Sequence, residues 1–255
     1  MRNPCRHVEL YNIVAISVDN QKAPEMTYIL GVHCTDGIVL IADRKIIINE
    51  GVGYIYGDKL YGDLGGVIVG FSGSKSTFEL FRTEIIQFVN EYRKDYNEGV
   101  SIHKLILQIS EVSYKLSNKY RASNDSFDVL IAISGTHLPN LASNLIYVYQ
   151  DGRIDNVDEY KSIGTGWPYG MIYLKQNWHG QISMKEAAAI GYFIIKYIET
   201  FELDLSVGIG KNSPQIWFVP NNQNDYQASP QLLEELDNLT TYRIDTFKKQ
   251  NYAKL

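Results

Sequence analysis

Cysteine is scarce in this chain of 255 residues, and its scarcity argues against two classes of protein. Cys5 and Cys34 form neither a CxxC pair nor a Cys/His spacing that suits zinc. A disulfide scaffold is also disfavoured, so the composition suits a reducing compartment and we expect a cytoplasmic protein. The five histidines show no metal-ligand spacing either, so we expect no metal and no cofactor.

Long apolar runs and an excess of positive charge are also missing. No run approaches the roughly 18 residues that a membrane-spanning helix requires. The short run Ile13–Val18 is followed by no small-residue cleavage site, so it does not predict a signal peptide. The net charge of −5 argues against a nucleic-acid-binding surface. We therefore expect neither a membrane nor a nucleic acid as a partner.

Short apolar runs separated by glycine and aspartate dominate the first part of the chain after residue 26. Two of these runs flank the turn Thr35-Asp36-Gly37 and predict a β-hairpin. Asp151-Gly152 predicts a second hairpin turn. The predicted strands are 28–32, 37–42, 66–73, 128–135, 145–154, 157–166 and 214–220.

Apolar residues at helical spacing predict four helices. They cover 76–96, a stretch that begins at the N-cap candidate Ser101, 183–201 and 229–249. The third carries a capping-box pattern, Ser183 with Glu186. Hairpins imply antiparallel sheets, and helices that do not alternate with single strands argue against a doubly wound fold. The predicted fold class is α+β, with two antiparallel sheets face to face and helices on their outer surfaces.

The chain divides into three parts on composition. Residues 1–26 read as a leader, an arm or a pro-segment, or as a stretch upstream of a true start at Met26; its short apolar run could also add an edge strand. Residues 27–220 form the main domain. Residues 221–255 form a C-terminal extension that we expect to be helical and peripheral.

Thr27 stands at the head of the first predicted hairpin. A threonine hydroxyl is a weak nucleophile and needs a nearby base. The α-amine of a chain that began at Thr27 would serve, because its ordinary pKa is about 8. Cleavage after Met26, or translation from Met26 followed by its removal, would expose that amine. The alternative is an ordinary strand threonine.

Four further positions could complete such a site. Lys59 would help to deprotonate a hydroxyl, and Asp43 would be its charge partner, because an unpaired buried charge is costly. Gly73 ends an apolar strand, where a backbone N–H can approach a substrate oxyanion. Thr165 offers a hydroxyl in the glycine-rich segment 162–168. The alternatives are a structural ion pair or solvated loop ends for Asp43 and Lys59, and simple turns for the other two.

The combined pattern resembles proteasome β-type subunits, which are N-terminal nucleophile hydrolases. It reads T-x-x-x-G-x-x-x-x-D-G-I-V-L-x-A-D-R-K, then a lysine, then F-S-G, then S-x-G-x-G-x-P. Thr27 falls on the family's catalytic threonine. Asp43 and Lys59 follow it by 16 and 32 positions and fall on the family's acid and lysine. Gly73 falls on the oxyanion glycine.

The resemblance implies a fold and an activity. The fold is a four-layer αββα sandwich, and the activity is threonine-type endopeptidase cleavage of unfolded polypeptides through an acyl-enzyme. The partners would be other α-type and β-type subunits in stacked rings. The chain lacks the N-terminal signature of the family's α-type subunits, so the β type is favoured.

The resemblance also implies supporting and pocket residues. Thr165 stands where the family has a serine, and Asp204 with Ser206 matches a second aspartate–serine pair, with Glu202 as a rival for the acid. Phe71 falls at the base of the substrate pocket, which suggests small or medium apolar substrate side chains. Lys75 and Glu79 fall near that pocket.

One departure keeps two other functions open. The family's self-processing subunits usually have glycine before the threonine, and here that residue is Met26. The chain could therefore be a structural β-like subunit that is never processed. It could also be a stand-alone proteasome-like hydrolase or protein ligase, which the unusual leader and the C-terminal extension favour.

Overall fold

A computed structural model describes residues 27–48, 53–62, 66–73, 75–96, 102–120, 127–135 and 143–252. The proposed leader, 1–26, and the N-cap candidate Ser101 lie outside these residues. Among the residues described, no helix combines the length and the apolar character that crossing a bilayer demands.

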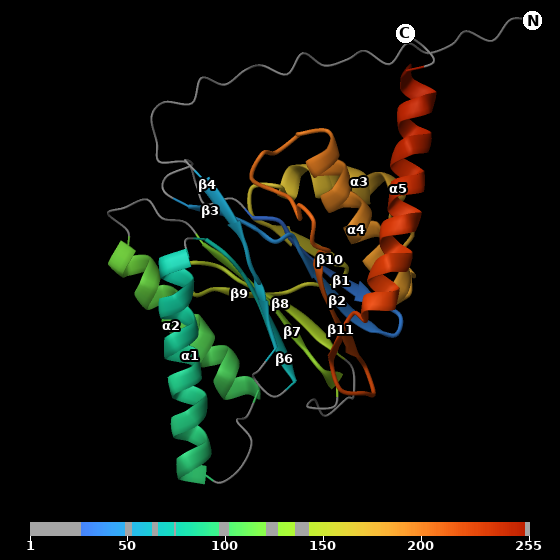
Figure 1. The fold of residues 1–255 in the computed structure, drawn as a ribbon. Coiled ribbons are helices and arrows are strands. Elements are labelled where there is room, and N and C mark those ends of the chain that lie inside the picture. The colour runs from blue at the N-terminus through green and yellow to red at the C-terminus, as the bar shows by residue number, and fades with distance from the viewer. Residues whose placement is uncertain are drawn as a thin grey trace, which may run out of the picture.

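Two five-stranded antiparallel sheets form the centre of the molecule (Figure 1). The first has the order β10-β1-β2-β11-β12 and the second the order β5-β6-β7-β8-β9. The first comprises β1 (Ile29–Cys34), β2 (Gly37–Ala42), β10 (Tyr160–Ile163), β11 (Gln215–Pro220) and β12 (Tyr226–Gln227). The second comprises β5 (Leu60–Tyr61), β6 (Val67–Ser72), β7 (Asp128–Ile133), β8 (Asn144–Val148) and β9 (Ile154–Asn156). A separate hairpin consists of β3 (Lys45–Ile48) and β4 (Gly53–Tyr56).

Helices cover the outer face of each sheet (Figure 1). Helices α1 (Lys75–Tyr96) and α2 (Ile102–Tyr120) share one apolar cluster with the second sheet. Helices α3 (Trp167–Asn177), α4 (Met184–Thr200) and α5 (Pro230–Tyr252) share another with the first sheet. A third cluster fills the space between the sheets. Residues of β2 alternate between this cluster and the one beneath α4, so every residue of β2 is buried. The predicted α+β sandwich of four layers is confirmed.

Several predicted elements differ in their bounds, and helix α3 and the individual strands β3, β4, β5 and β12 were missed. The strand predicted over 157–166 is limited to β10, and the glycine-rich turn predicted over 162–168 leads directly into α3. The predicted C-terminal helix is present as α5 and packs on α4. It buries Leu236 and Ile244, and the Tyr192 hydroxyl donates to Asp237.

Both ends of α4 are fixed locally. Ser183 accepts a hydrogen bond from the Glu186 backbone while the Glu186 side chain accepts from the Ser183 backbone, so the predicted capping box is confirmed. At the other end, the Leu203 N–H donates to the Ile198 carbonyl over 3.1 Å. This closure places Glu202 at a φ of 50°, a left-handed conformation in which glycine is usual. The following loop therefore leaves the helix through a strained residue.

Replacing Glu202 with glycine is expected to stabilise the protein by about 0.5–1 kcal/mol, because glycine adopts this φ without steric cost but loses more entropy on folding. Equilibrium urea unfolding measures the change. Glu202→Ala is the matched control, since it removes the carboxylate and keeps the strain. Equal stabilities for the two variants would contradict this explanation.

Candidate active site

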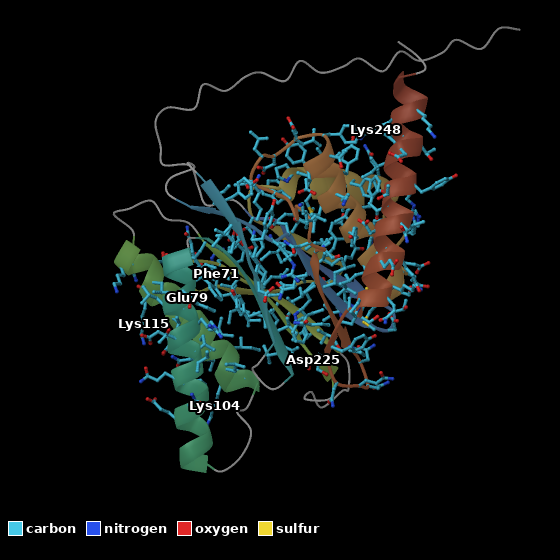
Figure 2. The ribbon with its side chains drawn as sticks, viewed as in Figure 1. Phe71, Glu79, Lys104, Lys115, Asp225 and Lys248 are labelled. Carbon is cyan, nitrogen blue, oxygen red and sulfur yellow. The ribbon has the colours of Figure 1, made fainter. Side chains whose placement is uncertain are left out.

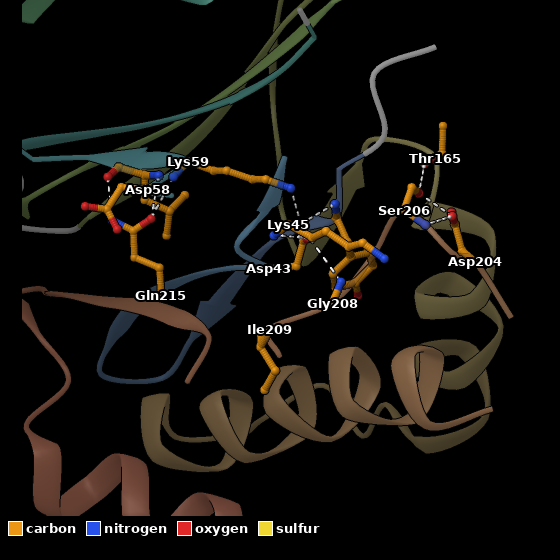
Figure 3. Close-up of polar contacts among 12 residues, drawn as sticks. Asp43, Lys45, Asp58, Lys59, Thr165, Asp204, Ser206, Gly208, Ile209 and Gln215 are labelled. Atoms are coloured by element: carbon orange, nitrogen blue, oxygen red, sulfur yellow. Dashed lines mark hydrogen bonds and ion pairs between the residues drawn. The ribbon is translucent and has the colours of Figure 1, made fainter. Parts of the chain in front are cut away.

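A buried ion pair lies where β2 ends (Figure 3). The Lys59 Nζ stands 2.6 Å from Asp43 Oδ1, and the two side chains are only 5% and 0% exposed. Burial raises the pKa of Asp43 and lowers that of Lys59, because each charge has left water. Their mutual attraction opposes both shifts. Lys59 therefore releases its proton more readily than an exposed lysine does.

The Asp43 carboxylate is also saturated with backbone donors. Its Oδ1 accepts from the Tyr28 N–H at 2.8 Å, and its Oδ2 accepts from the N–H groups of Lys45 at 3.1 Å and Gly208 at 3.2 Å. The first donor directly precedes β1, the second begins β3, and the third lies in the loop after α4. One carboxylate therefore fixes three chain segments around Lys59.

Gln215 positions Lys59 from the opposite side. Its Oε1 accepts from the backbone N–H groups of Lys59 at 2.9 Å and Leu60 at 2.8 Å, and its Nε2 donates to the Leu60 carbonyl at 2.6 Å. The sequence analysis did not single out this residue. The available signal was a glutamine at the start of an otherwise apolar strand, a polar group that needs partners once buried.

Thr27 is buried beside this ion pair, one residue before Tyr28. The Gly166 N–H lies 3.4 Å from the Thr27 carbonyl oxygen. The backbone of Gly164 approaches the same oxygen so closely that a Cβ added there would be 1.9 Å away. The turn between β10 and α3 therefore clamps the main chain of Thr27.

The Tyr28 side chain extends this clamp to α3. Its ring is fully buried, and a Cβ added to Gly170 would lie 2.2 Å from its hydroxyl oxygen. A Cβ at Gly166 would lie 3.0 Å from its ring. The two glycines, one helical turn apart, leave a slot for the ring. The position of Thr27 consequently depends on the position of α3.

Thr165, Asp204 and Ser206 form a second polar group (Figure 3). The Thr165 and Ser206 hydroxyl oxygens are 3.2 Å apart, and the Ser206 N–H donates to Asp204 Oδ1 at 2.9 Å. The Ser206 hydroxyl donates to the same carboxylate oxygen. Glu202, the sequence-level rival of Asp204, has an exposed side chain, so the structure places Asp204 in this group.

A pocket opens beside Thr27 and Lys59, and its lining also includes Phe71, Gly73, Phe78 and Glu79. Phe71, labelled in Figure 2, is buried. Its ring stacks on Phe127 at a centroid distance of 5.4 Å and is tilted against Phe78 at 5.1 Å. Gly73 must be glycine, because its φ is 155° and an added Cβ would be 2.6 Å from Phe127. The side chain of Lys75 lies outside the described part of the chain.

The described residues contain no group of three histidine, cysteine, aspartate or glutamate side chains that could hold a metal ion. The residues of the site supply hydroxyl, ammonium, carboxylate and backbone N–H groups.

This architecture, with a threonine, an aspartate and a lysine gathered at one end of an αββα sandwich, is the arrangement of N-terminal nucleophile hydrolases. The chain belongs to the Proteasome subunit family, whose profile matches residues 26–203. It is similar in fold to the Gly-1 mutant of Anbu from Hyphomicrobium sp. strain MC1, at a TM-score of 0.67 and 14% identity. The similarity covers 90% of this chain and 97% of that one. A sequence search among curated proteins gave no match.

Replacing Gly164 with alanine is expected to lower peptide hydrolysis by at least about tenfold, because the new Cβ would displace the Thr27 carbonyl. Gly180→Ala is the matched control. Gly180 has a similar φ, 80° against 86°, but open space around it, so both variants have the backbone strain and only one moves Thr27. Equal hydrolysis by the two variants, measured with a fluorogenic peptide, would contradict the proposed clamp.

Proposed function

We propose that this chain is a threonine-type endopeptidase subunit of a proteasome-like core particle and that Thr27 becomes its N-terminal nucleophile. One observation carries the proposal. Lys59, which the buried Asp43 holds in an ion pair, lines the same pocket as Thr27 and Gly73. A structural ion pair would not need to face a pocket that also contains a hydroxyl and a strand-ending glycine. Family membership supports a hydrolase of this class.

In the first step, the Thr27 hydroxyl oxygen attacks the carbonyl carbon of a substrate peptide bond. Its proton passes to the neutral α-amine of Thr27, with Lys59 lowering the pKa of the hydroxyl. The Gly73 N–H donates to the oxyanion that forms. The C–N bond then breaks, the leaving amine takes the proton, and an ester remains on Thr27.

In the second step, water attacks that ester. The α-amine accepts a proton from the water, and the Thr27 hydroxyl recovers it when the ester bond breaks. The group formed by Thr165, Asp204 and Ser206 would hold the α-amine and this water in place. Phe71 would close the bottom of the pocket that receives the substrate side chain, with Lys75 near it. We place the protein in the cytoplasm, with other α-type and β-type subunits as partners and unfolded polypeptides as substrates.

The experiment that tests this proposal is covalent labelling. The purified protein is incubated with a peptide that ends in an electrophilic carbonyl, and the adduct is located by peptide mapping. We expect one adduct per active chain, on Thr27, together with loss of hydrolysis of a fluorogenic peptide. Labelling at any other residue with loss of the activity would overturn the assignment.

A second candidate is a structural subunit that is never processed. Met26, which stands where self-processing relatives have glycine, is the observation in its favour. A particle whose chains all retain the residues before Thr27 and that hydrolyses no peptide would establish it. The third possibility, a stand-alone hydrolase or ligase, would give a particle much smaller than four stacked rings in native mass spectrometry.

A further inference from the structure

We propose that Glu199 is a positioning residue of the active site, whose carboxylate holds the loop after α4 against Asp43. Glu199 lies in the last turn of α4, and the described residues that line the pocket do not include it. It would therefore act on the reaction through other residues.

The last turn of a helix is an unfavourable place for a carboxylate. The final carbonyl groups of α4 carry a partial negative charge, which repels an acid beside them. This turn, described in full, contains no basic residue that would offset the repulsion. A carboxylate at this place therefore needs hydrogen-bond donors from outside the helix.

Two consecutive N–H groups of the loop supply those hydrogen bonds. Glu199 Oε1 accepts from the Ile209 N–H at 2.9 Å and from the Gly210 N–H at 2.8 Å. Successive backbone N–H groups that point the same way form a concave site for an anion. Gly210 helps to shape this site with a φ of 59°, and an added Cβ there would lie 2.4 Å from the Tyr56 hydroxyl oxygen. The Glu199 carboxylate is thus the anion that this loop binds, and hydrogen bonds to a charged acceptor are stronger than those between neutral groups.

One peptide group connects Glu199 to the catalytic acid. The Ile209 N–H that donates to Glu199 belongs to the same planar peptide group as the Gly208 carbonyl, so a fixed N–H direction also fixes the carbonyl. That carbonyl accepts from the Lys45 N–H at 3.0 Å. The Gly208 N–H, on the preceding peptide group, donates to Asp43 Oδ2 at 3.2 Å (Figure 3).

Glu199 also packs directly against Gly208, because a Cβ added to Gly208 would be 2.7 Å from Glu199 Oε1. Asp43 in turn holds the Lys59 ammonium, and the same loop carries two members of the second polar group. Without the Glu199 carboxylate, the loop would lose two hydrogen bonds to α4, and Asp43 would lose a fixed donor. The ion pair and the second polar group would then no longer be aligned with Thr27.

This effect should appear in kcat and not in KM. No described residue of the loop after α4 lines the pocket, so substrate binding should not depend on the loop. The catalytic part of this inference rests on the proposed function. The structural part does not, because amide hydrogen exchange reports on the hydrogen bonds of the loop without any substrate.

The experiment compares the full chain with three variants of Glu199. Glu199→Ala removes the carboxylate. Glu199→Gln keeps an acceptor oxygen at the same place without the charge. Glu199→Asp keeps the charge on a side chain that is one methylene too short to reach both N–H groups. Glu235→Ala is the matched control, since it removes the same side chain from α5, where its partner is the exposed Lys185.

Three measurements are made on each variant. Hydrolysis of a fluorogenic peptide gives kcat and KM, and hydrogen exchange gives the protection of the amides of Lys45, Ile209 and Gly210. Thermal unfolding shows that each variant is folded. If Glu199→Ala fails to fold, the comparison of Glu199→Gln with Glu199→Asp decides the question, because only the first of these keeps the acceptor in place.

We expect Glu199→Ala and Glu199→Asp to lower kcat at least about tenfold, with KM within about twofold of the wild type. Exchange of the three amides should be faster in both. Glu199→Gln should stay within about threefold of the wild type in kcat, and Glu235→Ala should match the wild type throughout.

A wild-type kcat in Glu199→Ala, or a change in KM alone, would overturn the positioning role. Glu199→Gln as impaired as Glu199→Ala, or Glu199→Asp as active as the wild type, would overturn the hydrogen-bond explanation. Equal exchange in all the variants would overturn the structural link to Asp43. A wild type that hydrolyses no peptide, together with faster exchange in Glu199→Ala, would count against the proposed function alone.

Discussion

Replacing Thr27 with alanine is expected to lower peptide hydrolysis by at least about a thousandfold, because Thr27 carries the one serine or threonine hydroxyl among the described residues that line the pocket with Lys59 and Gly73. The loss should appear in kcat, since the hydroxyl acts on the bond and contributes little to substrate binding. Steady-state hydrolysis of a fluorogenic peptide by the purified particle measures it. Thr27→Ser should retain part of the activity, because serine keeps the hydroxyl.

Thr165→Ala is the control for this prediction. Thr165 also carries a hydroxyl near the site, but its hydrogen-bond partner is Ser206, so its loss should cost far less activity than the loss of Thr27. If Thr27→Ala hydrolysed peptides within a few-fold of the wild type, the nucleophile would have to be another residue.

The second large effect concerns the buried ion pair. Asp43→Asn leaves the Lys59 ammonium without its charge partner in a fully buried place, and we expect the protein to lose about 3–5 kcal/mol of its free energy of unfolding. Hydrolysis should also be lost, because loss of the Asp43 charge lowers the pKa of Lys59 further and removes the acceptor that holds its ammonium near Thr27. Equilibrium denaturation in urea gives the stability change.

A double variant and a surface pair serve as controls. Asp43→Asn combined with Lys59→Met should recover part of the free energy of unfolding, because the unpaired buried charge is gone. It should recover none of the hydrolysis, because the reaction still requires the Lys59 ammonium. Glu235→Gln breaks the exposed Lys185–Glu235 pair and should change stability by less than about 1 kcal/mol. Similar losses of unfolding free energy on breaking the buried and the exposed pair would show that burial does not determine how much Asp43 contributes to stability.

The position of Asp43 in the ion pair could be predicted from the sequence, because a regular hairpin fixes where the end of β2 lies relative to the start of β1. β1 and β2 form a two-residue hairpin, so Asp43, directly after β2, has to come level with Thr27 and Tyr28 at the start of β1. The layers could be predicted for a similar reason, since hairpin turns and helical periodicity are local signals. Thr27, Asp43 and Lys59 therefore meet as their spacing indicated.

Contacts between distant segments could not be predicted in the same way. Helix α3 was missed because Gly166, Pro168 and Gly170 at its start are typical of a turn. The slot for Tyr28 depends on those same glycines, and its partner is more than a hundred residues away in the chain. Gln215 likewise shows its role only once β11 lies beside the segment that carries Lys59.

The choice between Asp204 and Glu202 also required three-dimensional information. The two acids lie two residues apart in a segment without periodicity. The left-handed backbone at Glu202 turns that side chain outward and lets Asp204 reach Ser206. No propensity rule assigns a left-handed conformation to a glutamate in advance, because the surrounding hydrogen bonds impose it.

The most direct test of the central claim is the mass of the intact chain in the active particle, measured together with its N-terminal sequence. We predict that hydrolytic particles contain a chain whose first residue is Thr27, with the free amine that the mechanism requires. Active particles in which every chain still carries Met26 or earlier residues would contradict the account.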